Sequence, residues 1–242
     1  MTHISPDHPV TLITGAGAGI GRATAVMLAE RGHALALAGR TEKTLRETAD
    51  LCALKAPGVA EPHVIVADVG EPRDARRMID ETIEHFGRLD ALVNNAGVAL
   101  LLPIEESTED VLRQAFDVNA IGPGLAIHHA WPIFVRQKGG CIVNVSTRGT
   151  QDPFPGFFAY AASKAAVNLY AKSCATEGKK HNIRAFSVAP GAVETKMLRA
   201  LFDEKTLPTD ACLAPEDVAA VIVACILGER DSDNGDTIWL SR

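Results

Sequence analysis

The chain has 242 residues, of which 22% are charged and 47% are hydrophobic, and these values are typical of a folded protein rather than a disordered one. Its net charge is −6 at pH 7, and no more than two lysines or arginines stand side by side. Nucleic acids and anionic membranes both require a dense basic surface, so the sequence excludes them as the main partner.

The cysteines and the N-terminal residues indicate where the protein works. Its five cysteines include no C-x-x-C pair: Cys52, Cys141, Cys174, Cys212 and Cys225. Free thiols in a reducing compartment fit this odd number better than disulfides or a zinc site. Met1–Val10 lacks the apolar core of a signal peptide, and no apolar run reaches the roughly 18 residues that span a membrane. We therefore expect a cytoplasmic protein with no membrane partner and no metal.

Short apolar runs alternate with amphipathic stretches of helical length. Seven runs are predicted strands: Val10–Thr14, Ala34–Ala38, His63–Ala67, Ala91–Val93, Cys141–Val145, Ile183–Val188 and Thr237–Leu240. Six stretches are predicted helices: Gly19–Arg31, Thr41–Leu54, Pro72–Phe86, Thr108–Arg136, Ala159–Lys180 and Pro215–Leu227. Strands this apolar are typical of a parallel sheet buried on both faces. The order predicts an α/β fold, a single doubly wound Rossmann-type domain over residues 1–242, whose parallel seven-stranded sheet has helices on both faces.

A glycine-rich turn joins the first strand to the first helix. Its sequence is Thr14-Gly15-Ala16-Gly17-Ala18-Gly19-Ile20-Gly21. Glycine allows the backbone to turn sharply and approach a ligand, and the helix that follows directs free N–H groups and a positive dipole end at an anion. The turn therefore predicts a site for the pyrophosphate of a dinucleotide. Its G-x-x-x-G-x-G spacing differs from the more common G-x-G-x-x-G, and a tight turn without a ligand is the alternative.

The second strand ends at Gly39 and Arg40, which bear on the choice of dinucleotide. In NAD-binding proteins an acidic residue near this position bonds to the ribose 2′-hydroxyl. Here Gly39 leaves room, and Arg40 offers a fork of donors to a 2′-phosphate. The sequence thus favours NADP(H), with NAD(H) as the second option. The alternative reading of Arg40 is a solvated loop residue.

Two segments carry groups suited to proton transfer. Tyr160 and Lys164 are spaced i, i+4, so they share one face of a predicted helix. A neighbouring ammonium group stabilises a phenolate, so we expect Lys164 to lower the pKa of Tyr160 and prepare it to exchange a proton with a carbonyl or alcohol oxygen. Upstream, a predicted strand runs into Ser146 and Thr147, either of which could bind the same oxygen. A hydroxyl that only caps a turn is the alternative there.

Together these segments resemble the short-chain dehydrogenase/reductase family. The motifs follow the family's order: Thr14-Gly-x-x-x-Gly-x-Gly21, Asp68 after the third strand, Phe86-Gly-Arg-Leu-Asp90, Asn94-Asn-Ala-Gly97, Asp117-Val-Asn119, Ile142-Val-Asn-Val-Ser146, Tyr160-x-x-x-Lys164 and Pro190-Gly-x-Val-x-Thr195. The resemblance implies an oxidoreductase that transfers a hydride between NADP(H) and a ketone, a 3-oxoacyl compound or a secondary alcohol. A cofactor-binding sensor or scaffold of the same fold, without turnover, is the alternative.

The resemblance also implies roles for individual residues. Asp68 and Val69 would lie beside the adenine, and Asn95, Ala96 and Gly97 would line the cofactor. Asn119 would hold a water that connects Lys164 to a proton relay. The nicotinamide end would be surrounded by residues that follow the sixth strand: Pro190, Gly191, Val193 and Thr195.

The chain departs from the family pattern at two positions. The family usually has a serine where gapless counting from Asn144 and from Tyr160 places Thr147. A one-residue shift at Gly149 would select Ser146 instead, and we favour Thr147. The second departure is Ala18, because many NADP-dependent members have a basic residue inside the glycine turn. The predicted preference for NADP(H) therefore depends on Arg40.

Apolar residues indicate where the substrate would bind. The densest aromatic patch, formed by Phe154, Phe157 and Phe158, leads into Tyr160. We interpret it as a wall of a pocket for a rather apolar small molecule, faced by Leu100–Leu102, with a buried loop anchor as the alternative. The irregular segment 195–214 is a candidate mobile flap over that pocket. Family members commonly pair two long helices, here Thr108–Arg136 and Ala159–Lys180, so the resemblance implies a homodimer or homotetramer.

Overall fold

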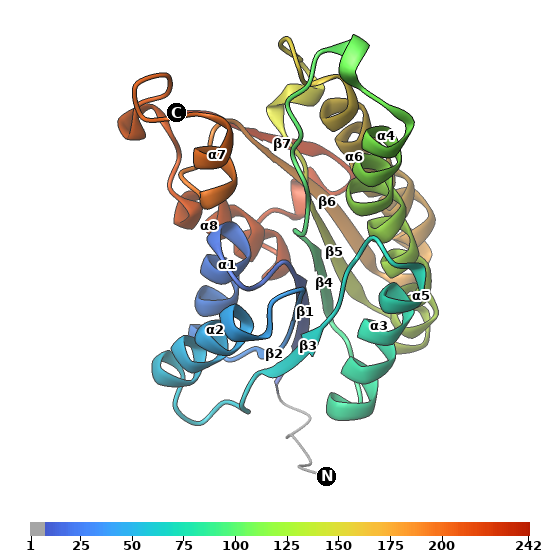
Figure 1. The fold of residues 1–242 in the computed structure, drawn as a ribbon. Helices are drawn as coiled ribbons and strands as arrows, with labels where there is room; N and C mark the ends of the chain where they lie inside the picture. Colours follow the sequence, from blue (N-terminus) through green and yellow to red (C-terminus); the bar gives the residue numbers. More distant parts are fainter. Residues whose placement is uncertain (1–7) are drawn as a thin grey trace.

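The computed structural model describes residues 8–242 (Figure 1). Residues 1–7, which hold most of the segment tested for a signal peptide, lie outside that range. One parallel sheet has the strand order β3-β2-β1-β4-β5-β6-β7. Its strands are β1 Val10–Thr14, β2 Ala34–Gly39, β3 His63–Val66, β4 Ala91–Asn94, β5 Gly140–Val145, β6 Ile183–Pro190 and β7 Thr237–Leu240. The predicted Rossmann-type sheet of seven parallel strands is confirmed.

Helices cover both faces of the sheet, as predicted (Figure 1). They are α1 Gly19–Glu30, α2 Glu42–Lys55, α3 Pro72–Phe86, α4 Glu109–Phe116, α5 Gly122–Gln137, α6 Phe158–Gly178, α7 Lys196–Leu201 and α8 Pro215–Ile226. Helices α1, α2 and α8 pack on one face, and α3, α4, α5 and α6 pack on the other. Successive side chains of β1 point to opposite faces of the sheet, because Leu12 belongs to one apolar cluster and Ile13 to the other. The sheet is thus buried on both sides, as its apolar strands required.

The predicted helix over Thr108–Arg136 is confirmed as one helical run, Glu109–Gln137, in which α4 and α5 are joined by a π-helical turn, Asp117–Ile121. In that turn the N–H of Gly122 donates to the carbonyl five residues back, on Asp117. Pro123 is the physical reason for the turn, since it has no N–H to give to the carbonyl of Asn119 four residues earlier. Periodicity does not reveal a π-helical turn, because the apolar stripe continues through it.

The segment 195–214 contains more regular structure than its sequence suggested. It holds α7 and a 3-10 turn, Thr209–Ala211, and a bridge between Val193 and Leu213 closes its base. Arg199 ties it together, because its guanidinium pairs with Glu194 and donates to the carbonyl of Leu207 at 2.7 Å. The segment is therefore an arch with internal bonds.

Two other expectations concern thiols and membranes. All five cysteines are free and buried. Within residues 8–242, no helix is both long enough and apolar enough to cross a bilayer.

Candidate active site

The predicted site residues gather where the strands end. In a parallel sheet all carboxyl ends lie at one edge, and the crevice outside that edge is where ligands bind in open α/β sheets. The loops after β1, β4, β5 and β6 carry the glycine turn, Asn95–Gly97, Thr147 and Gly191, respectively. The topology thus brings together groups as distant in the chain as Thr14 and Gly191.

The glycine turn has no room for side chains. A Cβ on Gly21 would lie 2.4 Å from the carbonyl oxygen of Gly15, and one on Gly15 would lie 2.8 Å from the Asn95 amide nitrogen. Gly15 and Gly19 also have positive φ angles, 66° and 52°, which favour glycine. No side chain caps the start of α1 at Ala18, so its first N–H groups are available to an anion. This backbone cradle fits a pyrophosphate.

Hydrogen bonds from Thr14 and Asn95 hold the glycine turn in place. The Thr14 hydroxyl accepts hydrogen bonds from the N–H groups of Asn95 (3.0 Å) and Ala96 (3.1 Å). The Asn95 amide donates to the carbonyls of Thr14 (2.9 Å) and Gly15 (3.2 Å). These hydrogen bonds join the loop after β1 to the loop after β4. The two side chains therefore fix the shape of the cradle and leave no donor of their own for a ligand.

The groups predicted around the adenosine end lie at the carboxyl ends of β2 and β3. Arg40 is exposed and forms no hydrogen bond or ion pair with any described residue. The Asp68 carboxylate accepts from the N–H of Gly70 at 2.9 Å, and Val69 is buried. The position of Gly17 is fixed by Arg22, a residue that the sequence analysis missed, whose guanidinium donates to the Gly17 carbonyl at 2.6 Å. The exposed guanidinium of Arg40, which has no partner among the described residues, fits a dinucleotide phosphate.

Thr147, and not Ser146, meets the tyrosine. The Thr147 side chain is the polar neighbour that favours the ionised form of the Tyr160 phenol. The Thr147 hydroxyl also accepts from the N–H of Gly149 at 3.2 Å. The Ser146 hydroxyl instead donates to the carbonyl of Lys164 at 3.3 Å and is buried. Consecutive strand residues point to opposite sides, so only one of the two hydroxyls reaches this position.

Burial raises the pKa of Tyr160 to about 12, and the neighbouring Thr147 side chain offsets part of that rise. The expectation that Lys164 would lower this pKa is therefore wrong for the chain by itself. The Lys164 ammonium donates to the carbonyl of Val145 at 2.7 Å, and burial lowers its own pKa to about 8. The phenol is thus held in its neutral, proton-donating form.

Asn119 and Gly97 flank the lysine. A Cβ on Gly97 would lie 3.0 Å from the Asn119 amide oxygen and 3.1 Å from the Lys164 ammonium. The Asn119 side chain is fully engaged, with 2.9 Å bonds to both backbone groups of Val98 and a 3.0 Å bond to the Ser163 hydroxyl. Its backbone carbonyl is the group that Pro123 leaves without the usual helical donor. Ser163 was missed as a site residue, although it lies inside the Tyr160–Lys164 motif.

The residues after β6 form the base of the arch and meet the glycine turn. β6 ends at Pro190, and the N–H of Gly191 donates to the carbonyl of Leu240 at 2.9 Å. Val193 is buried, and the Thr195 hydroxyl caps α7 by accepting from the N–H of Leu198 at 3.2 Å. A Cβ on Gly19 would lie 3.1 Å from the Thr195 methyl group. The arch therefore begins directly beside the phosphate cradle.

Aromatic rings extend from the tyrosine to the arch. The Phe157 ring contacts that of Tyr160 edge-on at 5.2 Å, and Phe154 packs on Phe157 at 3.8 Å between centroids. Phe202 of the arch lies 6.2 Å from Phe154, which is 45% exposed. From the other side, Leu101 contacts Gly156 so closely that a Cβ there would lie 2.9 Å from it. An apolar wall thus adjoins the phenol.

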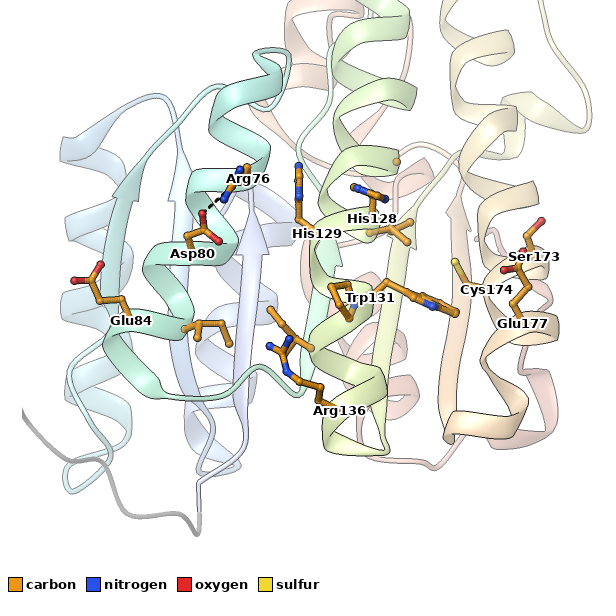
Figure 2. A pocket seen from close by; sticks show the side chains of 15 residues that line it. Arg76, Asp80, Glu84, His128, His129, Trp131, Arg136, Ser173, Cys174 and Glu177 are labelled. Carbon is orange, nitrogen blue, oxygen red and sulfur yellow. Dashed lines mark hydrogen bonds and ion pairs between the residues drawn. The ribbon is translucent and has the colours of Figure 1, made fainter.

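A second hollow lies away from this edge, on the outer surface of α3, α5 and α6. It is an open groove of about 920 Å³. Figure 2 shows its labelled side chains, which come from the three helices: Arg76, Asp80, Glu84, His128, His129, Trp131, Arg136, Ser173, Cys174 and Glu177. None of the groups predicted for chemistry lines this groove.

Comparisons with known proteins identify the family of the chain. Residues 9–206 match the family model described as short chain dehydrogenase. An uncharacterized oxidoreductase of Thermotoga maritima is 40% identical over 79% of this chain and 74% of that protein. A 3-oxoacyl-(acyl-carrier-protein) reductase, FabG, of the same organism is 34% identical over 96% of this chain and 95% of that protein. The crystal structure of a levodione reductase covers 96% of both chains with a TM-score of 0.90 and 28% identity.

Proposed function

The chain belongs to the short-chain dehydrogenase family of oxidoreductases, and from that premise we propose that it uses NADP(H) to reduce the carbonyl group of a rather apolar ketone or 3-oxoacyl compound. One observation carries the proposal: the Thr147 side chain stabilises the ionised form of the neighbouring Tyr160 phenol, at the same edge of the sheet as the glycine cradle. Two neighbouring hydroxyls could together hold a single carbonyl oxygen.

The residues of the site would divide the work of the reaction. The bound dinucleotide would supply the hydride that reaches the carbonyl carbon. Thr147 would hold the carbonyl oxygen, and Tyr160 would transfer its phenolic proton to that oxygen as negative charge develops there. Lys164 and the backbone carbonyl of Asn119 would return a proton to the phenol through a bound water. The phenol is neutral near pH 7, so it has a proton to give in the reductive direction.

Arg40 supports NADP(H) as the cofactor. Its guanidinium is exposed and has no partner among the described residues, so it is available to a 2′-phosphate. Gly39 adds no carboxylate that would repel that phosphate or bind a ribose 2′-hydroxyl. NAD(H) is the second option, and kinetic comparison of the two cofactors distinguishes them.

The rings next to Tyr160 support an apolar substrate, with the arch 195–214 as a flap that opens to admit it. Phe154 and Phe157 form one wall, and Phe202 of the arch completes it. Covering the half-exposed Phe154 ring with an apolar ligand would be favourable, because it removes apolar surface from water.

We also propose that two copies of the chain pair through α5 and α6. The groove there exposes Trp131 between walls of both charge signs, with Arg136 on α5 and Glu177 on α6. A two-fold axis brings such a surface against itself, so opposite charges can pair across it. Light scattering should give the mass of a dimer or tetramer, and Trp131→Glu should reduce it to that of one chain. An unchanged mass would place the interface elsewhere.

The test of the reaction uses the two tyrosines of the chain, Tyr160 and Tyr170, which both lie on α6. Wild-type protein, NADPH and a panel of ketones and 3-oxoacyl thioesters should show substrate-dependent loss of NADPH absorbance. Tyr160→Phe removes the proton donor and should lower kcat by about 100- to 10,000-fold while NADPH binding, measured by fluorescence, is kept.

The control is Tyr170→Phe, which removes a hydroxyl that lies near Gly124. Tyr170 follows Tyr160 on α6 by almost three helical turns. The control variant should keep wild-type turnover. Equal activity of the Tyr160→Phe variant and the wild type would refute the role of Tyr160. Tight NADPH binding without turnover on the whole panel would instead favour the sensor or scaffold.

A further inference from the structure

Arg148 follows the proposed catalytic hydroxyl directly and has an unused positive charge. Its side chain is exposed, and within residues 8–242 it forms no hydrogen bond and no ion pair. Its backbone is fixed, because Arg148 begins a 3-10 turn and its carbonyl accepts from the N–H groups of Gln151 (2.9 Å) and Asp152 (3.2 Å). The charge is therefore carried by a rigid stretch of backbone next to Thr147.

The side chain lies beside Gly191, which follows the end of β6. A Cβ on Gly191 would come within 3.9 Å of the Arg148 Cδ atom. Arg40, the candidate ligand of the 2′-phosphate, follows β2, which is three strands away from β5. Three strand spacings amount to about 14 Å. Arg148 is thus separate from the adenosine end and cannot duplicate the role of Arg40.

Among the described residues, neither Glu194 nor Asp152 forms an ion pair with Arg148. Glu194, which follows Gly191 by three residues, is held by Arg199, and the hydrogen bond from Arg199 lowers its pKa. Asp152 belongs to the same turn, but its carboxylate is not within ion-pair distance of Arg148. A guanidinium presents a planar fork of donors that matches the oxygens of a carboxylate or a phosphate.

We propose that Arg148 binds an anionic oxygen group of the substrate, a carboxylate or a phosphate. The inference rests on the proposed reduction of a carbonyl held by Thr147 and Tyr160. The favoured substrates are then ketones with an apolar body, which packs on Phe154 and Phe157, and with an acidic group at a fixed distance from the carbonyl. Arg148 is in this view the residue that determines specificity, and it takes no part in the proton transfer.

The experiment compares matched ketones that differ in charge. The probes are 4-acetylbenzoate, its neutral methyl ester and 4-acetylphenyl phosphate, with 2- and 3-acetylbenzoate as probes of position. Arg148→Met should lower kcat/KM for the preferred anionic ketone by about 10-fold or more and change that of the ester by less than 2-fold, because a hydrogen bond to a charged group is lost only with the anion. Arg148→Lys should restore part of the loss. Comparing carboxylate and phosphate identifies the group that the site takes.

A control for charge alone is Lys172→Met, which removes an exposed positive charge from α6. It should leave the ratio of acid to ester unchanged, and KM for NADPH should be the same in all variants. Equal losses on acid and ester, or equal kcat/KM for the three positional isomers, would overturn the proposal while leaving carbonyl reduction intact.

Direct binding separates this inference from the proposed function. Calorimetry on the NADPH-saturated protein should show tighter binding of the anionic ketone to the wild type than to Arg148→Met. If that difference is present but no ketone is reduced, the anion site stands and the proposed reaction fails. If wild type binds the acid no more tightly than the ester, the anion site is refuted.

Discussion

The two halves of the site are built in different ways. At the phosphate end, backbone fits against backbone, and a Cβ on Gly21 would lie 2.4 Å from the Gly15 carbonyl oxygen. At the substrate end, side chains do the work, and Phe154 remains 45% exposed beside an arch. A backbone cradle can hold only one shape of ligand, whereas exposed side chains can change in kind without disturbing the sheet. Substitutions at the phosphate end should therefore lower stability and cofactor affinity, whereas those at the substrate end should change only the affinity for substrate.

The largest effect is expected where the backbone is tightest. Gly21→Ala should lower the free energy of unfolding by about 3 kcal/mol, because the new methyl group overpacks against fixed backbone. NADPH affinity, measured by fluorescence titration, should fall more than about 100-fold as the cradle shifts. Gly139→Ala is the matched control, since a Cβ there has no neighbour closer than 3.7 Å. If both variants bind NADPH equally, the cradle is not rigid.

The half of the sheet that carries the cradle, β1 to β3, should also respond to acid through His33, which lies at the edge opposite the glycine turn. Burial lowers the pKa of this histidine to about 4 from 6.5, and its ring bonds to the Thr11 hydroxyl at 2.9 Å. The unfolded chain takes up a proton near pH 6.5 that the folded one resists until pH 4, so stability should fall across this window by at most about 3 kcal/mol.

The His33 effect is measured by urea unfolding at several pH values. His33→Gln keeps a partner for Thr11 and removes the titration, so its stability should change less with acid than that of the wild type. Parallel pH profiles for the two proteins would show that His33 does not couple this half to pH.

A smaller effect is expected at the edge of the cradle. Arg40→Gln should raise KM for NADPH by about 10-fold and leave KM for NADH nearly unchanged, because only the 2′-phosphate loses a charged partner. Arg46→Gln removes another exposed arginine nearby, which pairs with Glu42, and should change neither value. Equal changes for both cofactors in the Arg40 variant would remove the basis for preferring NADP(H).

The smallest effect should come from the substrate end. Phe202→Ala should raise KM for an apolar ketone only a few-fold, because it removes one ring, 6.2 Å from Phe154, from the arch. NADPH affinity should be unchanged, since Phe202 does not contact the glycine turn. A large loss of NADPH binding would mean that the arch and the cradle form one unit, and the contrast between the two regions would be lost.

Local sequence patterns were enough for the sheet, its order of elements and the glycine turn. Apolar runs identify strands buried on both faces, and glycines between a strand and a helix identify a turn that side chains would block. The i, i+4 spacing of Tyr160 and Lys164 likewise fixes their shared helix face. Each of these features is set by neighbours a few residues away, so the sequence by itself determined them.

The remaining features depend on contacts between distant segments, and only the tertiary structure decided them. Counting residues left Ser146 and Thr147 open, and the packing of β5 against α6 brings Thr147 to the phenol. The rise in the pKa of Tyr160 comes from burial, which no spacing rule includes. The arch is bonded internally by Arg199, and Arg148, which has no partner within residues 8–242, reaches the end of β6 because β5 and β6 are neighbours in the sheet. Burial and long-range contact are properties of the assembled chain, and the local sequence does not contain them.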